Sequence, residues 1–239
     1  MLLGTKRIFS CVSIGIGMIA SFCLYRSMHS ASYIVAADDI FSASMVTKLS
    51  DYVTHHADFS TKKLCNKLKE EFQEIKECYA RLYADGKCVI SVEAKKPLIS
   101  LNSAFVLTYD GTSIERVSFH ENGLSSLETI AVQQALTTTD GQALAAYIKS
   151  IPTDYLSKYE VCWKNKHEIA FYDKERKVLF LTDVTTLPNE AIHQSLNEII
   201  HGMKTLPNKK QKQLVADIRF EHQLIIYEKR GAYHGNSIF

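Results

Sequence analysis

The sequence of 239 residues lacks the short motifs that mark the common classes of enzyme. It contains no GxSxG nucleophile turn, no HExxH zinc-binding helix, no phosphate-binding glycine loop and no paired-glycine dinucleotide fingerprint. The histidines are scattered, and His193 and His201 on one predicted helix are interpreted as surface or hydrogen-bonded residues rather than ligands. Asp217 and Arg219, close together on a predicted strand, are interpreted as a structural ion pair. These absences favour a protein that has no catalytic activity and needs no cofactor.

Strong charge of either sign is also absent, because 28 basic residues nearly balance 26 acidic ones and leave a net charge of +2. A nucleic-acid-binding surface requires a clear basic excess, so we expect no nucleic acid partner. The six cysteines include no CxxC pair and no histidine at zinc-finger spacing, which disfavours a metal site. Cys11 and Cys23 fall in an apolar run, and the other cysteines are expected to be buried apolar residues (Cys65, Cys78, Cys88 and Cys162).

One long hydrophobic run is present, residues 8–25, and it contains no charged side chain. As a helix the run rises about 27 Å, close to the ~30 Å hydrocarbon thickness of a bilayer. We interpret it as a single N-terminal transmembrane helix. A cleaved signal peptide is the alternative, since residues 28–31 form a passable cleavage region.

The charges beside this run predict its orientation. Lys6 and Arg7 precede the run, whereas Arg26 follows it. Because basic residues favour the cytoplasmic side, residues 1–7 are expected to form a cytoplasmic tail and residues 26–32 a linker on the opposite side. The bulk of the chain is then periplasmic or otherwise extracytoplasmic.

Residues 33–101 are predicted to form a compact domain of the order βααββ. Ser60 is a candidate cap for the second helix, and Asp85 with Gly86 forms a turn signal between the last two strands. Pro97 is taken to close the domain. The expected elements are strand, helix, helix, strand and strand (33–36, 45–53, 60–72, 78–83 and 88–93). A small sheet covered by two helices follows from this order.

Residues 102–239 are predicted to form a second domain, a mainly antiparallel β-sheet with helices, so that the fold class of the whole chain is α+β. Its helices are expected at 127–136, 140–151 and 188–203. Its strands are expected at 104–109, 159–163, 168–172, 177–181, 215–220 and 223–228.

The order of these features resembles the FtsQ/DivIB family of bacterial cell-division proteins. In that family the βααββ unit is a POTRA domain whose final hairpin ends with an acidic residue shortly before proline, as with Glu93 and Pro97 here. An extended segment ending in Asp-Gly follows, as with Asp110 and Gly111. Near the C-terminus the family has a strand of the form apolar-Asp-apolar-Arg-aromatic, which residues 215–220 match.

The resemblance implies a non-enzymatic scaffold of the division complex. It implies a single-pass protein of the inner (cytoplasmic) membrane at the septum, with a cytoplasmic N-terminus. Besides the lipid bilayer, the implied partners are other membrane-anchored division proteins of the coiled-coil FtsB/FtsL type. The alternative is a secreted or membrane-anchored envelope protein with an unrelated binding function, which predicts neither septal localisation nor co-purification with such partners.

The last predicted strand, residues 223–228, is the candidate partner-binding site. It is short, apolar and nearly uncharged, and an exposed sheet edge of this kind can accept a strand from a partner. Alternation directs Leu224 and Ile226 to the core and the other apolar residues to the opposite face. The alternative is that these other residues are incidental surface. The candidate contact residues are Gln223, Leu224, Ile225 and Tyr227.

Overall fold

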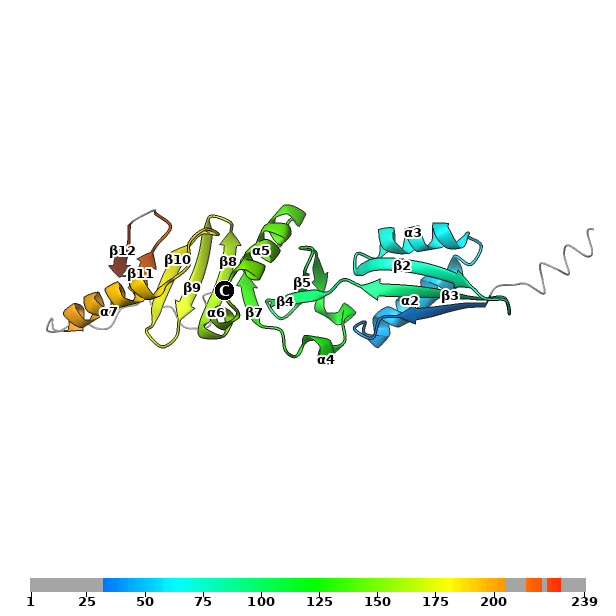
Figure 1. Cartoon of the computed structure of the whole chain (residues 1–239), viewed down its shortest axis with the longest axis horizontal. Helices are drawn as coiled ribbons and strands as arrows, with labels where there is room; N and C mark the ends of the chain where they lie inside the picture. The colour runs from blue at the N-terminus through cyan, green and yellow to red at the C-terminus, as the bar shows by residue number, and fades with distance from the viewer. Residues whose placement is uncertain (1–31, 205–213, 221–222, 229–239) are drawn as a thin grey trace, which may run out of the picture. The chain divides into compact units, whose positions relative to one another are not determined.

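A computed structural model of the protein describes residues 32–204, 214–220 and 223–228 (Figure 1). The predicted α+β class is confirmed, and the chain divides into two compact units. The first unit comprises residues 32–39 and Ala43–Ala94, and the second comprises Ile40–Ser42 and the described residues from Lys95 onward. The boundary therefore falls before Lys95, whereas the sequence analysis put it after residue 101.

The first unit consists of a three-stranded sheet and two helices in the predicted order. These are β1 (Ser32–Ala37), α2 (Ala43–His55), α3 (Thr61–Glu71), β2 (Ile75–Leu82) and β3 (Lys87–Ala94). The central strand β3 is parallel to β1 and antiparallel to β2. Ser60 caps α3 as predicted, because its side chain accepts a hydrogen bond from the Lys63 amide. Alternate residues of β3 and the apolar faces of both helices are buried (Leu49, Leu64, Leu68, Cys88, Ile90 and Val92).

The second unit is built on a nine-stranded sheet of order β12-β11-β10-β9-β8-β7-β4-β5-β6. The strands are β4 (Pro97–Leu101), β5 (Phe105–Thr108), β6 (Ser113–Glu115), β7 (Thr129–Val132), β8 (Tyr159–Asn165), β9 (Glu168–Asp173), β10 (Val178–Thr182), β11 (Leu214–Asp217) and β12 (Ile225–Glu228). Most neighbouring pairs are antiparallel, and the three parallel pairs are β4 with β7, β7 with β8, and β10 with β11. The helices are α4 (Glu121–Leu124), α5 (Thr138–Ser150), α6 (Thr153–Lys158) and α7 (Glu190–Lys204), and a 3-10 turn spans Arg116–Ser118.

The main core of the second unit lies between one face of this sheet and helices α5, α6 and α7. Trp163, Phe171 and Phe180 are its largest fully buried side chains. A smaller apolar cluster, made of strand residues alone, lies on the opposite face (Ala131, Cys162, Ala170, Leu179, Leu181 and Val215).

The helix predicted over residues 127–136 is wrong, because the structure has strand β7 (Thr129–Val132) there. Ile130 packs into the main core and Ala131 into the cluster on the opposite face. A strand buried on both faces between parallel neighbours shows no alternation, so its pattern does not distinguish it from a buried helix. β4 was missed because Pro97 was taken as a terminator, whereas it begins the strand, a position at which a missing amide is tolerated.

β7 joins the two halves of the nine-stranded sheet through a narrow row of contacts. Only two of its residue pairs face β4 and only two face β8. The side chain of Asn102 extends this row, because its Nδ2 donates to the Val132 carbonyl and its Oδ1 accepts from the Val132 amide, both at 2.8 Å. We call this row the β7 seam.

The predicted Asp-Gly turn after β5 packs directly on helix α5. Gly111 has φ of +86°, and a Cβ atom at Gly141 of α5 would lie 2.2 Å from the Gly111 carbonyl oxygen. The helix and the turn therefore meet backbone to backbone. Burial opposes the ionisation of Asp110, but hydrogen bonds from Thr108, Lys95 and Thr112 lower its pKa to about 2.

We expect Gly141→Ala to destabilise the second unit by about 2 kcal/mol, because the added methyl group meets backbone that cannot rotate away. The measurement is denaturant-induced unfolding. Gly123→Ala is the control, since a Cβ atom there meets only the flexible Ile40 side chain, at 3.2 Å. Equal effects of the two substitutions would contradict the backbone-to-backbone contact.

Candidate functional site

The strand singled out by the sequence analysis is β12, which stands last in the order of the nine-stranded sheet. Ile225 and Tyr227 are 43% and 45% exposed, whereas Leu224 and Ile226 pack against the main core. Gln223 is exposed and precedes the strand. The structure therefore brings the candidate residues together at one edge but directs them to different sides.

The pairing of β11 decides which backbone groups of β12 are directed outward. The amide of Ile218 donates to the Leu181 carbonyl of β10 at 2.9 Å. Because successive amides of a strand point to opposite sides, that of Asp217 faces β12. Asp217 lies opposite Ile225, so the Ile225 amide faces β11 in turn. The next amide, that of Ile226, points to the outer side, where no described strand pairs with it.

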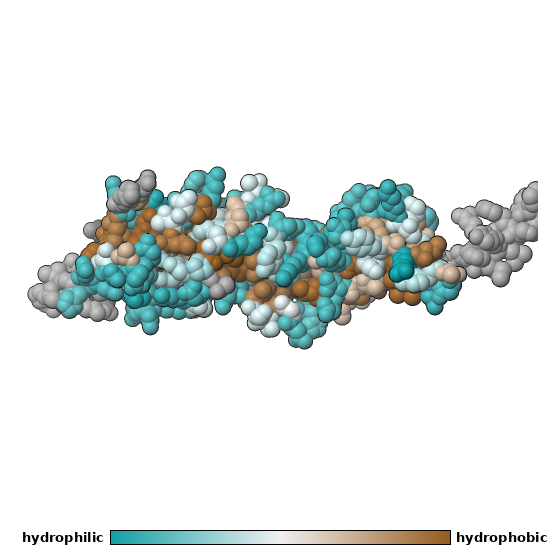
Figure 2. Space-filling model, viewed as in Figure 1, coloured by the Kyte–Doolittle hydropathy of each residue, from teal (hydrophilic) through white to brown (hydrophobic). Residues whose placement is uncertain are grey.

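The edge thus combines outward backbone groups with apolar side chains. Hydrophobic surface gathers over β10 to β12 in Figure 2. On β12 itself, Ile225 and Tyr227 contribute exposed apolar area, and tyrosine adds a hydroxyl group that can remain solvated. An extended peptide could therefore add to this edge through main-chain hydrogen bonds and contact both side chains.

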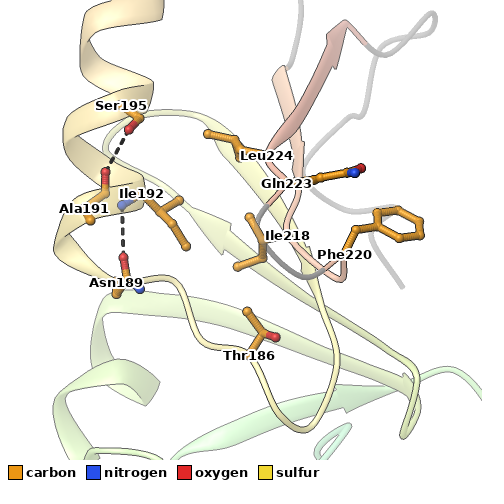
Figure 3. Close-up of a pocket in the computed structure, with 9 residues that line it drawn as sticks. All are labelled: Thr186, Asn189, Ala191, Ile192, Ser195, Ile218, Phe220, Gln223 and Leu224. Atoms are coloured by element: carbon orange, nitrogen blue, oxygen red, sulfur yellow. Dashed lines mark hydrogen bonds between the residues drawn. The ribbon is translucent and has the colours of Figure 1, made fainter.

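An open groove of about 420 Å³ lies beside the start of β12. Figure 3 shows Ile192 of α7, Ile218 and Leu224 converging on it, while Phe220 and Gln223 point away. No local sequence pattern predicts this groove, because its walls come from two segments that are distant along the chain, within residues 186–195 and 218–224. Its lining residues are Thr186, Asn189, Ala191, Ile192, Ser195, Ile218, Phe220, Gln223 and Leu224.

Asp217 and Arg219 form the predicted ion pair, with Arg219 Nη2 2.6 Å from Asp217 Oδ2. Arg219 lies beyond the end of β11, not within a strand as expected. Its Nε donates to Asp217 Oδ1 at 2.9 Å, and its Nη1 lies 3.3 Å from Glu168. The hydrogen bonds from Arg219 lower the pKa of Asp217. This network holds the turn that leads from β11 towards β12.

Helix α7, which forms one wall of the groove, is tied to the sheet by a buried polar contact. The hydroxyl of Tyr159 on β8 lies 2.6 Å from Nε2 of His193. His193 is 4% exposed and stacks on Tyr159, as well as packing edge-on against Phe180. Its Nδ1 is buried and has no hydrogen-bond partner among the described residues.

The surroundings of His193 disfavour its protonated form. Burial is the largest effect that lowers the pKa of this imidazole, and the cations Arg176 and Lys158 act in the same direction. Asp173 and Glu190 oppose the shift only in part. His193 therefore serves as a neutral structural group that fixes α7.

The described part of the chain contains no group of three or more His, Cys, Asp or Glu side chains that could hold a metal ion. Among the same residues, no helix is long and apolar enough to cross a membrane. The predicted transmembrane run, residues 8–25, lies outside the described residues. In sequence comparisons the chain matches no protein-family model and no curated protein.

We expect the second unit to lose stability as the pH falls below 6.5, the ordinary pKa of histidine. In that range the unfolded chain binds a proton at His193 that the folded chain does not, so the free energy of unfolding falls by up to about 1.4 kcal/mol per pH unit. Denaturant unfolding across this range measures the slope.

His193→Gln should remove this slope, whereas His167→Gln, at an exposed position in the turn between β8 and β9, should retain it. The carboxylates with lowered pKa, such as Asp110 and Asp217, begin to lose their contribution only below about pH 5, so the slope is measured above that value. A slope that survives in His193→Gln would assign the pH dependence to another group.

Proposed function

We propose that this chain is a non-enzymatic scaffold of the bacterial division complex, related to the FtsQ/DivIB family. It binds other membrane-anchored division proteins of the FtsB/FtsL type through its extracytoplasmic units. The observation that carries the proposal is the β12 edge, where Ile225 and Tyr227 are exposed beside an outward-facing amide. Proteins normally protect such an edge by charge, proline or a covering segment, and β12 carries neither charge nor proline between Ile225 and Tyr227.

The first unit supports the same assignment. Its order βααββ is the order of a POTRA domain, and its two helices bury one face of a mixed sheet. The Asp-Gly turn, which is one of the family motifs, has a defined packing role through Gly111 and Gly141. The Asp217–Arg219 pair, from another family motif, holds the approach to the binding edge.

The proposed location is the inner membrane at the division septum. Residues 8–25 anchor the chain as a single span, residues 1–7 lie in the cytoplasm, and both units lie on the other side of the membrane. The uncharged run and its flanking basic residues support this arrangement.

The test is co-purification of small membrane-anchored coiled-coil proteins with the full chain from detergent-solubilised membranes, together with septal localisation. We expect Tyr227→Ala to weaken binding of such a partner's external segment about 30-fold, equivalent to about 2 kcal/mol for a hot-spot residue. A titration with the purified segment measures the change.

Ile226→Ala is the control, because that side chain packs against the core rather than facing the partner. We expect it to lower thermal stability and to affect binding less than Tyr227→Ala does. Full affinity in a well-folded Tyr227→Ala protein would remove Tyr227 from the interface, and absence of any co-purified division protein would overturn the proposed function.

A comparison of proline with alanine at Ile226 tests whether backbone groups of β12 bind the partner. Proline at Ile225 would remove an amide that faces β11, so it tests folding instead. Ile226→Pro and Ile226→Ala both replace the same partly buried side chain by a smaller one, but only proline removes the outward amide. We expect about 10-fold weaker binding for proline than for alanine, since one main-chain hydrogen bond contributes about 1 kcal/mol or slightly more. Equal affinities of the two variants would exclude strand addition.

A further inference from the structure

One end of the first unit combines exposed apolar residues with the start of the described chain. Ser32, the first residue of β1, lies opposite Lys87, the first residue of β3. The turn between β2 and β3 therefore lies at the same end of the unit as the first residue of β1 (Figure 1). The Tyr33 hydroxyl donates to the carbonyl of Ala57 at 3.2 Å, which brings the loop between α2 and α3 to the same end. We call this end the β1 end.

The β1 end exposes large apolar side chains. Leu82 and Tyr83, at the tip of the hairpin, are 67% and 44% exposed, and Ile34 is also exposed. The Arg81 guanidinium lies over the Tyr83 ring, 5.3 Å from its centroid. The hairpin is well formed, because the Tyr83 amide donates to the Lys87 carbonyl at 2.8 Å. The tip is thus a hydrogen-bonded hairpin turn that presents both apolar and basic side chains.

Charge is distributed unevenly along the first unit. The exposed cations of the β1 end outnumber its acids, Asp58 and Asp85, and they are Lys62, Lys63, Arg81 and Lys87. The opposite end, where α3 stops and β2 begins, is acidic. Its glutamates are Glu70, Glu71, Glu74, Glu77 and Glu93, and its lysines are Lys69 and Lys76. The unit therefore presents a basic end and an acidic end.

The length of chain before β1 places the β1 end near a bilayer, if residues 8–25 are the anchor proposed above. Only residues 26–31 separate that run from Ser32. Even fully extended, this segment reaches about 25 Å. The basic, apolar end of the unit is thus the end closest to the membrane, and the acidic end is directed away from it.

We propose that the β1 end of the first unit rests on the outer surface of the bilayer that holds residues 8–25. Leu82 and Tyr83 enter the interfacial region, where aromatic side chains are favoured. Lys62, Lys63 and Arg81 face anionic lipid headgroups. This contact fixes the orientation of the first unit relative to the membrane. It rests on the proposed anchor but is independent of the partner-binding edge.

The experiment uses the full chain in nanodiscs made with lipids whose acyl chains carry bromine, which quenches nearby tryptophan. The native Trp163 is 1% exposed and provides a constant background in every variant. Leu82→Trp places a probe at the hairpin tip. Glu71→Trp is the matched control. Glu71 is exposed at the end of α3, at the opposite end of the unit, and is separated from Leu82 by roughly the length of β2, about 25 Å. Phe22→Trp reports separately on the anchor.

We expect brominated lipid to lower the added emission of Leu82→Trp about twofold, since an interfacial indole lies next to the upper acyl chains. Glu71→Trp should be unaffected. The quenching of Leu82→Trp should decrease when phosphatidylglycerol is replaced by zwitterionic lipid, and when Lys62→Gln and Arg81→Gln are added.

Quenching of Phe22→Trp without quenching of Leu82→Trp would overturn the contact and leave the anchor intact. No quenching of Phe22→Trp would remove the anchor and the contact together. Equal quenching of Leu82→Trp and Glu71→Trp would mean that no particular end faces the lipid, which also overturns the proposal. Protection of Leu82→Trp from an aqueous quencher, with no effect of brominated lipid, would assign the tip to a protein partner instead.

Discussion

The C-terminal edge of the second sheet depends on one constraint of backbone geometry, namely that each amide in a strand can point to only one neighbour. In the parallel pairing of β10 with β11, every second amide of β11 is directed towards β10, as the hydrogen bond from the Ile218 amide to the Leu181 carbonyl shows. The remaining amides of β11 hold β12 and leave the amide of Ile226 directed outward. Side chains alternate as well, so one register determines which groups stabilise the edge and which remain available for binding.

Much of the fold could be predicted from the sequence, because many elements have a local pattern. The helical stripes of α2, α3 and α7, and the apolar runs of β8 to β10 with their hairpin-length connections, lie within single segments of the chain. β7 could not be predicted, because it is buried on both faces and its neighbours β4 and β8 come from distant parts of the sequence. Strand order has no local signal in the sequence, so the position of β7 between β4 and β8 is seen only in the structure.

The candidate site shows the same division between local and distant information. The exposure of Ile225 and Tyr227 follows from alternation along one short strand, which the sequence contains. The direction of their amides depends on the parallel register between β10 and β11, and the groove depends on α7 meeting the turn after β11. The contact that fixes α7 joins Tyr159 to His193 across the core, and neither residue signals this pairing in its local sequence.

The β7 seam gives the second unit a mechanical weak point. Two residue pairs on each side of β7, together with the side chain of Asn102, join the two halves of the sheet, whereas β8 and β9 share six pairs. The strands are not the only connection between the halves, because α5 packs on the Gly111 turn of one half and, through Tyr147, on Trp163 of the other. Separation of the halves at β7 would therefore require α5 to leave one of them, so this helix acts as a brace across the shortest row of strand pairs.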